Sequence, residues 1–279
     1  MNTGKFLRMQ RVIEPDSGTS VICALDHGMT SPTYLGELSA IADRATETVR
    51  GGANVIMMSA GMIDAAKHAF TPTTSFAMLL SASAIMPGEL NHVVEIGKVE
   101  TALQLGADAV VVYVALGGAS EDSMISFVAR TGEACRRLGM PFIAEAEFPT
   151  TYRPDQEMAD QFGEEYLRRN VRLCAELGAD IIKTNWPGDR ESFIRVLAAA
   201  GDIPVVLAGG SRVEDLELLT RMQQSREAGA IGCSVGRNIF QHRDPEAITR
   251  ALCRVIREGW SAESAHEELV GAVENKEAF

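Results

Sequence analysis

The sequence lacks long apolar runs and closely spaced cysteines. No uninterrupted apolar stretch reaches the roughly 18 residues that a membrane-spanning helix needs, and the N-terminal residues contain no apolar signal core. The five cysteines lie far apart, form no CxxC pair and fall mostly in apolar segments. This usage is typical of a reducing compartment. We therefore expect an unexported, cytoplasmic protein that does not associate with a membrane.

The sequence also has fewer basic than acidic residues: 26 Lys and Arg, 38 Asp and Glu, and a net charge of -12. No basic stripe is present to neutralise phosphates along a groove, which argues against a nucleic-acid partner. A small anionic substrate needs only a few local donors and remains compatible with this charge. The five histidines are scattered without HxH or HExxH spacing, so the sequence predicts no metal site.

What the chain does contain is a repeated junction between a helix and a strand. "GGANVIMM", "LGADAVVVYV", "LGADIIKT" and "AGAIGCSVG" each place a glycine, suited to a helix C-cap, before an apolar run rich in β-branched residues. With four further apolar runs they predict eight strands, near residues 20–26, 53–58, 75–83, 107–115, 141–148, 179–185, 204–210 and 230–236. Amphipathic stretches such as "EEYLRRNVRLCAEL" separate most of them.

Eight alternating strands and helices predict a single-domain α/β fold, the (β/α)8 TIM barrel. A doubly wound open sheet is the alternative, but no GxGxxG follows the first strand. No Pro-, Ser- or charge-rich linker divides the chain. We expect an N-terminal arm at 1–19, the barrel at 20–260 and a C-terminal helix or tail at 261–279. That last segment either caps the barrel or meets another subunit.

Active sites of such barrels lie at the C-terminal ends of the strands, where Lys183 ends an otherwise apolar run. Alternation of side chains places Ile182 toward the helices and Lys183 toward the barrel mouth. Desolvation there lowers the pKa of an amine, and a neutral amine can attack a carbonyl to form a Schiff base. The other interpretation is a lysine held in a salt bridge by a strand carboxylate.

Two glycine-rich turns follow the seventh and eighth strands, in "VVLAGGSR" and "CSVGRNIFQ". Backbone N–H groups at such turns bind phosphate, and this part of a barrel is where phosphate sites recur. Glycine also serves ordinary tight turns. Because two such turns lie side by side, and an arginine adds a charged fork, we predict a phosphate site at Gly209, Gly210, Ser211, Gly236 and Arg237.

Other polar residues flank these positions. Glu145 and Glu147 share the inward face of the fifth strand and either shuttle protons or balance the charge of Lys183. Asp26 lies at the end of the first strand and is either a catalytic residue or a turn residue. His27 follows it and either orients Asp26 or closes the turn. Trp186 follows the sixth strand and is a candidate for the mouth, although a lone loop aromatic also serves packing.

With these residues assembled, the sequence resembles the archaeal-type class I fructose-bisphosphate aldolase family, including its amino-dideoxyheptulosonate synthases. The resemblance covers nearly the whole chain and is carried by "ALDHGMTS", "GMPFIAEAEFP", "LGADIIKTNWPGD", "PVVLAGGSR" and "GAIGCSVGRNIFQHRDP". It implies that Lys183 forms the Schiff base, that Asp26 assists it and that the glycine turns hold a substrate phosphate. It also implies a cytoplasmic homo-oligomer, often built from five-membered rings, hence a pentamer or decamer.

Two features depart from the family pattern. The usual strand-five tyrosine, in a "YPRG" context, is missing from "EAEFPTT". Counting from Pro141 puts Glu147 at its position, counting from Pro149 puts Phe148 there, and face parity favours Glu147. The heptulosonate synthases also have a His-Lys pair after strand two, where this chain has Ser59 and Ala60.

The expected activity is a metal-free, cofactor-free Schiff-base aldolase or transaldolase acting on a phosphorylated ketose or ketone of the dihydroxyacetone phosphate type. The iminium is its own electron sink, so no cofactor is required. Two alternatives stay open. One is a phosphorylated-dione thiolase or an isomerase that uses the same site without an imine. The other is a catalytically silent sugar-phosphate binder.

Overall fold

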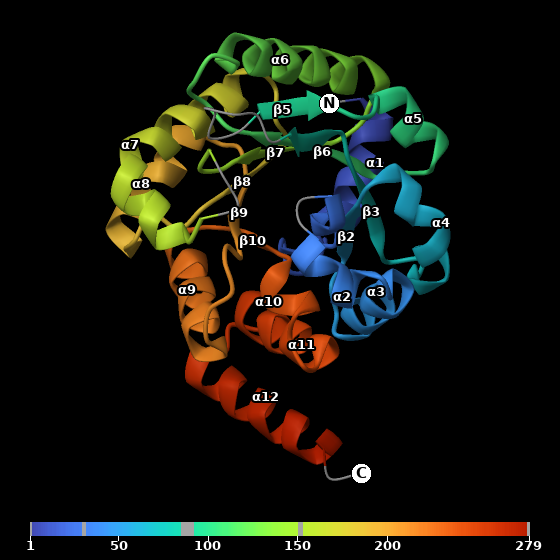
Figure 1. Ribbon diagram of the computed structural model, residues 1–279, viewed down its shortest axis with the longest axis vertical. Helices are drawn as coiled ribbons and strands as arrows, with labels where there is room; N and C mark the ends of the chain where they lie inside the picture. The colour runs from blue at the N-terminus through green and yellow to red at the C-terminus, as the bar shows by residue number, and fades with distance from the viewer. Residues whose placement is uncertain (1, 30–31, 85–91, 150–152, 278–279) are drawn as a thin grey trace.

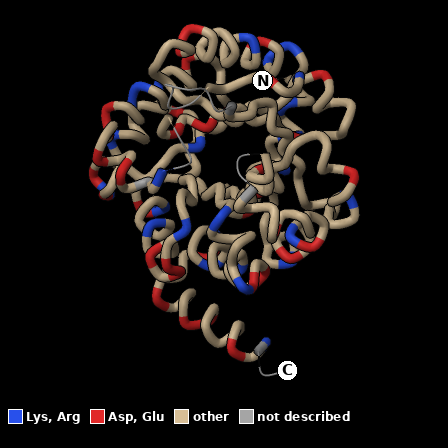
Figure 2. Tube along the Cα trace, viewed as in Figure 1, with Lys and Arg blue, Asp and Glu red and all other residues tan. Residues whose placement is uncertain are grey.

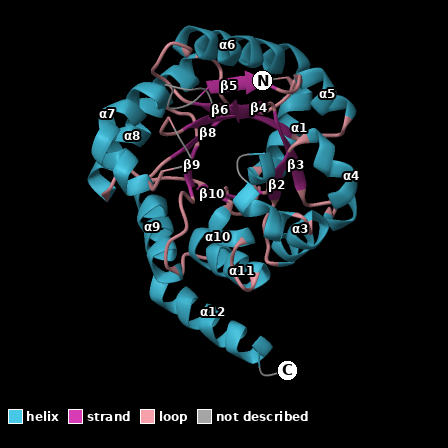
Figure 3. Cartoon of the chain, in the orientation of Figure 1, coloured by secondary structure: helices cyan, strands magenta, loops and turns pink. Residues whose placement is uncertain are grey.

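Eight parallel strands close into a barrel, and the helices form a ring around it (Figure 1, Figure 3). The computed structural model describes residues 2–29, 32–84, 92–149 and 153–277. Around the barrel the strands follow the order β1-β10-β9-β8-β7-β6-β3-β2. They are β1 (Ser20–Ala24), β2 (Val55–Met58), β3 (Ser75–Leu79), β6 (Ala109–Val114), β7 (Phe142–Ala146), β8 (Ile181–Thr184), β9 (Val205–Ala208) and β10 (Gly232–Val235). The predicted TIM barrel is therefore confirmed, and each predicted strand contains an observed one.

The helices alternate with these strands. They are α1 (Thr3–Val12), α2 (Leu35–Leu38), α3 (Ile41–Arg50), α4 (Ile63–Ala66), α5 (Val99–Gln104), α6 (Glu121–Leu138), α7 (Asp155–Glu176), α8 (Arg190–Ala200), α9 (Asp215–Ala228), α10 (Arg237–Phe240), α11 (Pro245–Ile256) and α12 (Ala262–Glu277). Over the described part of the chain, none of them combines the length and apolarity that crossing a bilayer would demand. Acidic and basic residues are interspersed along the outer helices (Figure 2).

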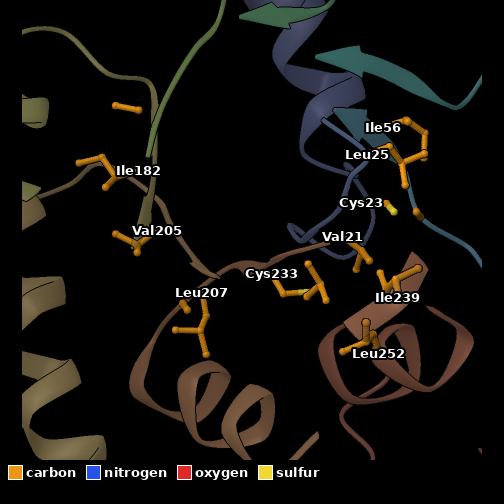
Figure 4. Close-up of a cluster of buried hydrophobic side chains, with 14 of the residues drawn as sticks. Val21, Cys23, Leu25, Ile56, Ile182, Val205, Leu207, Cys233, Ile239 and Leu252 are labelled. Atoms are coloured by element: carbon orange, nitrogen blue, oxygen red, sulfur yellow. The ribbon is translucent and has the colours of Figure 1, made fainter. Parts of the chain in front are cut away.

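Two apolar layers hold the barrel together. Because side chains alternate along a strand, Ile22, Val111, Ile143 and Ile181 fill the interior. The neighbouring residues Val21, Ile182, Val205, Leu207 and Cys233 point outward and pack against the helices (Figure 4). All five cysteines are buried and free, in agreement with their expected role as small core residues.

The N-terminal segment, expected only as an arm, forms a helix that lies across the N-terminal end of the barrel. Lys5 of α1 pairs with Asp180, just before β8, at 2.7 Å, and Arg11 pairs with Asp108, just before β6. Val12 is fully buried against the interior layer, and its carbonyl accepts a hydrogen bond from Ser20 Oγ at 2.8 Å. Helix α1 thus closes the end of the barrel that is opposite the predicted site.

The third predicted strand, 75–83, is divided in the structure. β3 ends at Leu79, and Ser81–Ala84 forms β4, which pairs antiparallel with β5 (His92–Glu95) outside the barrel. Where the chain leaves the barrel, Ser81 Oγ accepts the Tyr113 N–H at 2.9 Å. The resulting hairpin follows the C-terminal end of β3 and therefore stands at the barrel mouth.

Helix α12 packs along α9 and α11 on the outer wall, and extends past the barrel in Figure 1. Lys276 near its end forms an ion pair with Asp244 at 3.0 Å, and Glu268 pairs with Arg254 of α11 at 3.0 Å. The C-terminal segment is therefore a helix attached to the outer wall.

Candidate active site

A cavity opens at the C-terminal ends of the barrel strands. Its described lining includes the predicted catalytic residues Lys183, Glu145, Glu147 and Asp26, together with His27. These residues come from β7, β8 and the end of β1, segments that lie far apart in the sequence. Parallel strands that start at one end of a barrel finish at the other, so their last side chains converge.

Lys183 points into this cavity, as the parity of its strand predicts. It lies opposite Glu145 in the pairing of β7 with β8, while its neighbour Ile182 faces the outer layer (Figure 4). Its Nζ donates to Glu145 Oε1 at 2.7 Å and lies 2.8 Å from Glu147 Oε1. Lys183 is only 8% exposed, and both glutamates are also buried. One amine is therefore held between two carboxylates out of bulk water.

The two neighbouring carboxylates determine the charge of this lysine. Burial alone would lower the pKa of Lys183, but the carboxylates of Glu145 and Glu147 outweigh it, and the pKa is raised above its ordinary value. Burial also raises the pKa of Glu145 to about 7, against the opposing effect of the nearby ammonium. The structure contains the salt bridge to a strand carboxylate that was the other sequence-based interpretation of Lys183. A neutral amine here requires proton transfer within the cluster.

Asp26 and His27 lie on the other side of the same cavity. Burial acts to raise the pKa of Asp26, but the neighbouring His27 and Lys183 lower it below its ordinary value. His27 Nδ1 lies 3.5 Å from Asp26 Oδ1, and its ring packs between Tyr34 and Phe240 at centroid distances of 5.6 and 5.2 Å. The aromatic contacts hold the imidazole beside the Asp26 carboxylate.

The two glycine turns meet at this cavity, where Gly209, Gly210, Gly236 and Arg237 contribute to the lining. A Cβ at Gly236 would lie 2.5 Å from His27 Cε1 and 2.9 Å from the Ala24 carbonyl oxygen. A Cβ at Gly209 would lie 2.7 Å from Val235 Cγ1. Any side chain would therefore displace the backbone that forms the turns, which explains glycine at both positions.

Two predicted binding residues are not brought to the cavity wall. Ser211 lies just beyond the lining glycines, and its carbonyl accepts from Asn238 Nδ2 at 3.1 Å. Trp186 packs against Phe193 of α8, with ring centroids 5.3 Å apart, and does not line the cavity. The indole is retained by the apolar helix layer, which is the packing role that a single loop aromatic often has.

Sequence reasoning missed Tyr113, which lines the cavity from β6 and lies opposite Glu145. Its hydroxyl donates to the Phe148 carbonyl at 2.5 Å and so fixes the segment that follows Glu147. The sequence could have identified Tyr113, because it is the one polar side chain in "AVVVYV". It lies two residues after Val111 and therefore faces the barrel interior as Val111 does. Serines at 81 and 83, from the unpredicted hairpin, line the cavity as well.

The two residues that the alternative counts put at the family tyrosine position lie in different environments. Glu147 lines the cavity, whereas Phe148 is 2% exposed and stacks on Tyr166 of α7 at a centroid distance of 6.2 Å. Among the residues that the structure describes, no group of three or more His, Cys, Asp and Glu side chains is placed to hold a metal ion.

Comparisons with known proteins agree with this geometry. The sequence profile of the DeoC/LacD family aldolases matches residues 20–242. A 2-amino-3,7-dideoxy-D-threo-hept-6-ulosonate synthase of Halobacterium salinarum is 32% identical over 267 residues, 95% of this chain and 96% of its own. Such a synthase of Archaeoglobus fulgidus is 31% identical over 264 residues, 95% of each chain.

Solved structures resemble the chain over most of its length. A Schiff-base-forming fructose-1,6-bisphosphate aldolase has a TM-score of 0.78 at 25% identity, covering 90% of this chain and 99% of its own. A fructose-bisphosphate aldolase of Slackia heliotrinireducens has a TM-score of 0.80 at 18% identity, covering 98% and 92% of the two chains, which supports the fold alone.

The barrel and its relatives define a class of enzyme, the Schiff-base-forming class I aldolases. Within that class, the chain belongs to the DeoC/LacD family of aldolases.

Proposed function

We propose that this aldolase makes or cleaves a carbon–carbon bond in a phosphorylated ketose or ketone, with Lys183 forming the imine. The observation that carries the proposal is the buried position of Lys183 between Glu145 and Glu147, at 2.7 and 2.8 Å, in a cavity bordered by two glycine turns. Burying a charged amine inside an apolar barrel requires carboxylates that compensate its charge. One of these carboxylates is placed to accept the proton of the amine.

Proton transfer to Glu145 starts the reaction in this proposal. With a pKa of about 7, Glu145 is partly ionised near neutrality and can accept a proton from the Lys183 ammonium. The neutral amine then attacks the substrate carbonyl carbon. The carbonyl oxygen takes up a proton to give a carbinolamine, which loses water to leave the iminium. The iminium accepts the electron pair of the breaking carbon–carbon bond, and hydrolysis later releases the product.

Glu147 and Asp26 move protons in the later steps. In the cleavage direction a base removes the proton of the hydroxyl whose carbon leaves as an aldehyde, and an acid returns a proton to the enamine carbon. Glu147 lines the cavity beside Lys183 from the segment after β7, where the family usually has its tyrosine. Asp26 has a lowered pKa and stays ionised, which suits it to stabilise the iminium.

The substrate phosphate is assigned to the glycine turns after β9 and β10. Backbone at Gly209, Gly210 and Gly236 reaches the cavity without intervening Cβ atoms, and Arg237 lines the same side. A donor of the dihydroxyacetone phosphate type spans from these turns to Lys183. The relatives include both a heptulosonate synthase and a fructose-1,6-bisphosphate aldolase, so the proposal covers both formation and cleavage of the bond.

A second candidate uses the same cavity without an imine, as a thiolase or an isomerase of a phosphorylated dione. The raised pKa of Lys183 favours it, because an ammonium can stabilise an enolate or donate a proton but cannot attack a carbonyl.

Borohydride reduction separates the two candidates. The protein is incubated with dihydroxyacetone phosphate and sodium borohydride, and its peptides are analysed by mass spectrometry. We expect a stable adduct on Lys183 that fails to form in Lys183→Met. Lys67→Met serves as the matched control because Lys67 is exposed and pairs with the exposed Asp64 at 3.6 Å. Loss of activity in Lys183→Met without any adduct in the wild type would support the imine-free candidate.

We also infer a homo-oligomer from the family resemblance. Phe6 and Leu7 of α1 are half exposed at the N-terminal end of the barrel and suit a contact between copies. Light scattering after size-exclusion chromatography measures the assembly mass, and a mass of 30.1 kDa would contradict the inference.

A further inference from the structure

A second cavity, of about 230 Å³, adjoins the active-site cavity and shares Asp26 and Met29 with it. Its walls come from the segment after β1 and from the segment after β2. The apolar side chains that line it are Leu25, Leu35, Leu38, Ile41 and Met62. The two cavities are therefore neighbours, and Asp26 and Met29 border both of them.

The lining of this cavity suits an uncharged group. Asp26 is the only charged residue among the described residues that border it, and Ser59 adds the only other polar side chain. A phosphate or carboxylate placed here would find no cation among the described lining residues, and it would lie near the ionised Asp26. Burying such an anion without a partner is costly, whereas burying methylene groups is favourable.

The rim of the cavity is also unusually apolar for a surface. Met29, Leu35 and Met62 are 46, 50 and 42% exposed, although they are large hydrophobic residues. Three such side chains around one opening form a patch of the kind that marks a binding site. Because Asp26 and Met29 border both cavities, the patch lies next to the site where a substrate would react with Lys183.

The place of the second cavity in the strand order indicates which half of the substrate it would bind. In the strand order, β9 and β10 carry the glycine turns, β1 carries Asp26, and β2 follows on the far side. The phosphate-bearing donor occupies the β9–β10 side in the proposed function, so the β1–β2 side remains for the aldehyde. We propose that this cavity binds the substituent of the acceptor aldehyde and that this substituent is apolar and uncharged. The proposal rests on the proposed function.

Matched aldehydes test the proposal. With dihydroxyacetone phosphate as donor, kcat/KM is measured for acetaldehyde, propanal, butanal and hexanal, and we expect it to rise by up to about fourfold per added methylene. Butanal should exceed 4-oxobutanoate, which differs by a carboxylate, and glyceraldehyde 3-phosphate should have no advantage over glyceraldehyde. A preference for either anionic partner, or a flat aliphatic series, would overturn the proposal.

A variant of the rim gives an independent readout. Met62→Arg places a cation at the opening, so the preference for hexanal over acetaldehyde should fall and the discrimination against 4-oxobutanoate should weaken. The matched control is Ile194→Arg, an equally exposed position on α8 that should keep the wild-type aldehyde preferences. If Met62→Arg keeps the wild-type preferences, or changes only the oligomeric mass, the patch is a contact between copies and the proposal fails.

Failure of this proposal is distinct from failure of the proposed function. Exchange of the α-proton of dihydroxyacetone phosphate with deuterated water, without any acceptor, reports donor activation by Lys183 alone. If exchange occurs and the aldehyde preferences are reversed, only the acceptor assignment is wrong. If neither exchange nor a borohydride adduct is seen, Lys183 does not activate the donor, and the proposed function is wrong. The acceptor assignment, which rests on that function, is then also wrong.

Discussion

Glu145 is the residue whose charge decides whether Lys183 can react. Its pKa is raised by burial to about 7, so it is protonated below that pH and ionised above it. Only the ionised form can accept the proton of the ammonium. We therefore expect kcat/KM of the wild type to fall as pH drops below about 7 and to level off above it.

In Glu145→Gln the amide cannot accept that proton, so the limb near pH 7 should vanish and the remaining activity should be lower at every pH. The pH profile of kcat/KM for both proteins, over a range where each stays folded by circular dichroism, checks this. An inflection near pH 7 that persists in Glu145→Gln would assign the titration to another group.

Single residues were predictable as far as strand parity and position at a strand end determine them. Lys183, Glu145, Glu147 and Asp26 all reach the cavity for that reason. The raised pKa of Lys183 was not predictable, because it depends on distances to two carboxylates that parity does not supply. Trp186 was misplaced because loop aromatics have no alternation to fix their direction.

At the scale of elements, helix α6 lies close to the chain that ends α7. Gly132 of α6 sits where a Cβ would approach the Leu177 carbonyl oxygen to 2.0 Å. Backbone cannot swing aside like a side chain, so Gly132→Ala must separate the two helices.

We expect Gly132→Ala to lower the free energy of unfolding by about 2 kcal/mol or more, as judged by urea denaturation. Gly271→Ala is the matched control, since Gly271 lies in α12 with nothing within 4 Å of its Cβ position. Alanine is the better helix former, so that variant should be as stable as the wild type or up to about 1 kcal/mol more stable. Equal stability of the two variants would contradict the close approach.

The eight strands followed from glycine junctions and β-branched runs, although every predicted range is longer than the observed strand. The β4–β5 hairpin was not predicted, because "SASA" lacks the bulky apolar alternation of a strand and its partner begins only at His92. Small polar residues form strands only where a partner is available, and that partner is set by the tertiary fold.

For the whole molecule, helix α1 is joined to the N-terminal end of the barrel by a buried ion pair. Lys5 is 8% exposed, and Asp180 Oδ2, besides accepting from its Nζ, accepts the Phe142 N–H at 2.9 Å. Removing the amine leaves a poorly solvated carboxylate. We expect Lys5→Met to lower the free energy of unfolding by about 2–3 kcal/mol.

The control for this variant is Lys67→Met, because the side chains of Lys67 and Asp64 are 58 and 91% exposed. Its effect should stay below about 1 kcal/mol in the same denaturation experiment. Similar losses in both variants would show that α1 adds nothing to the stability of the barrel. The sequence predicted only an arm here because the acidic partners lie more than 90 residues away from α1.

The central claim is that Lys183 bonds covalently to a phosphorylated ketone held by the glycine turns. A crystal structure of the protein soaked with dihydroxyacetone phosphate tests it most directly. The account predicts continuous density from Lys183 Nζ to the ketone carbon, with the phosphate against Gly209, Gly210 and Gly236. A bound ligand with Lys183 still paired to Glu145 and Glu147, and no bond to Nζ, would contradict it.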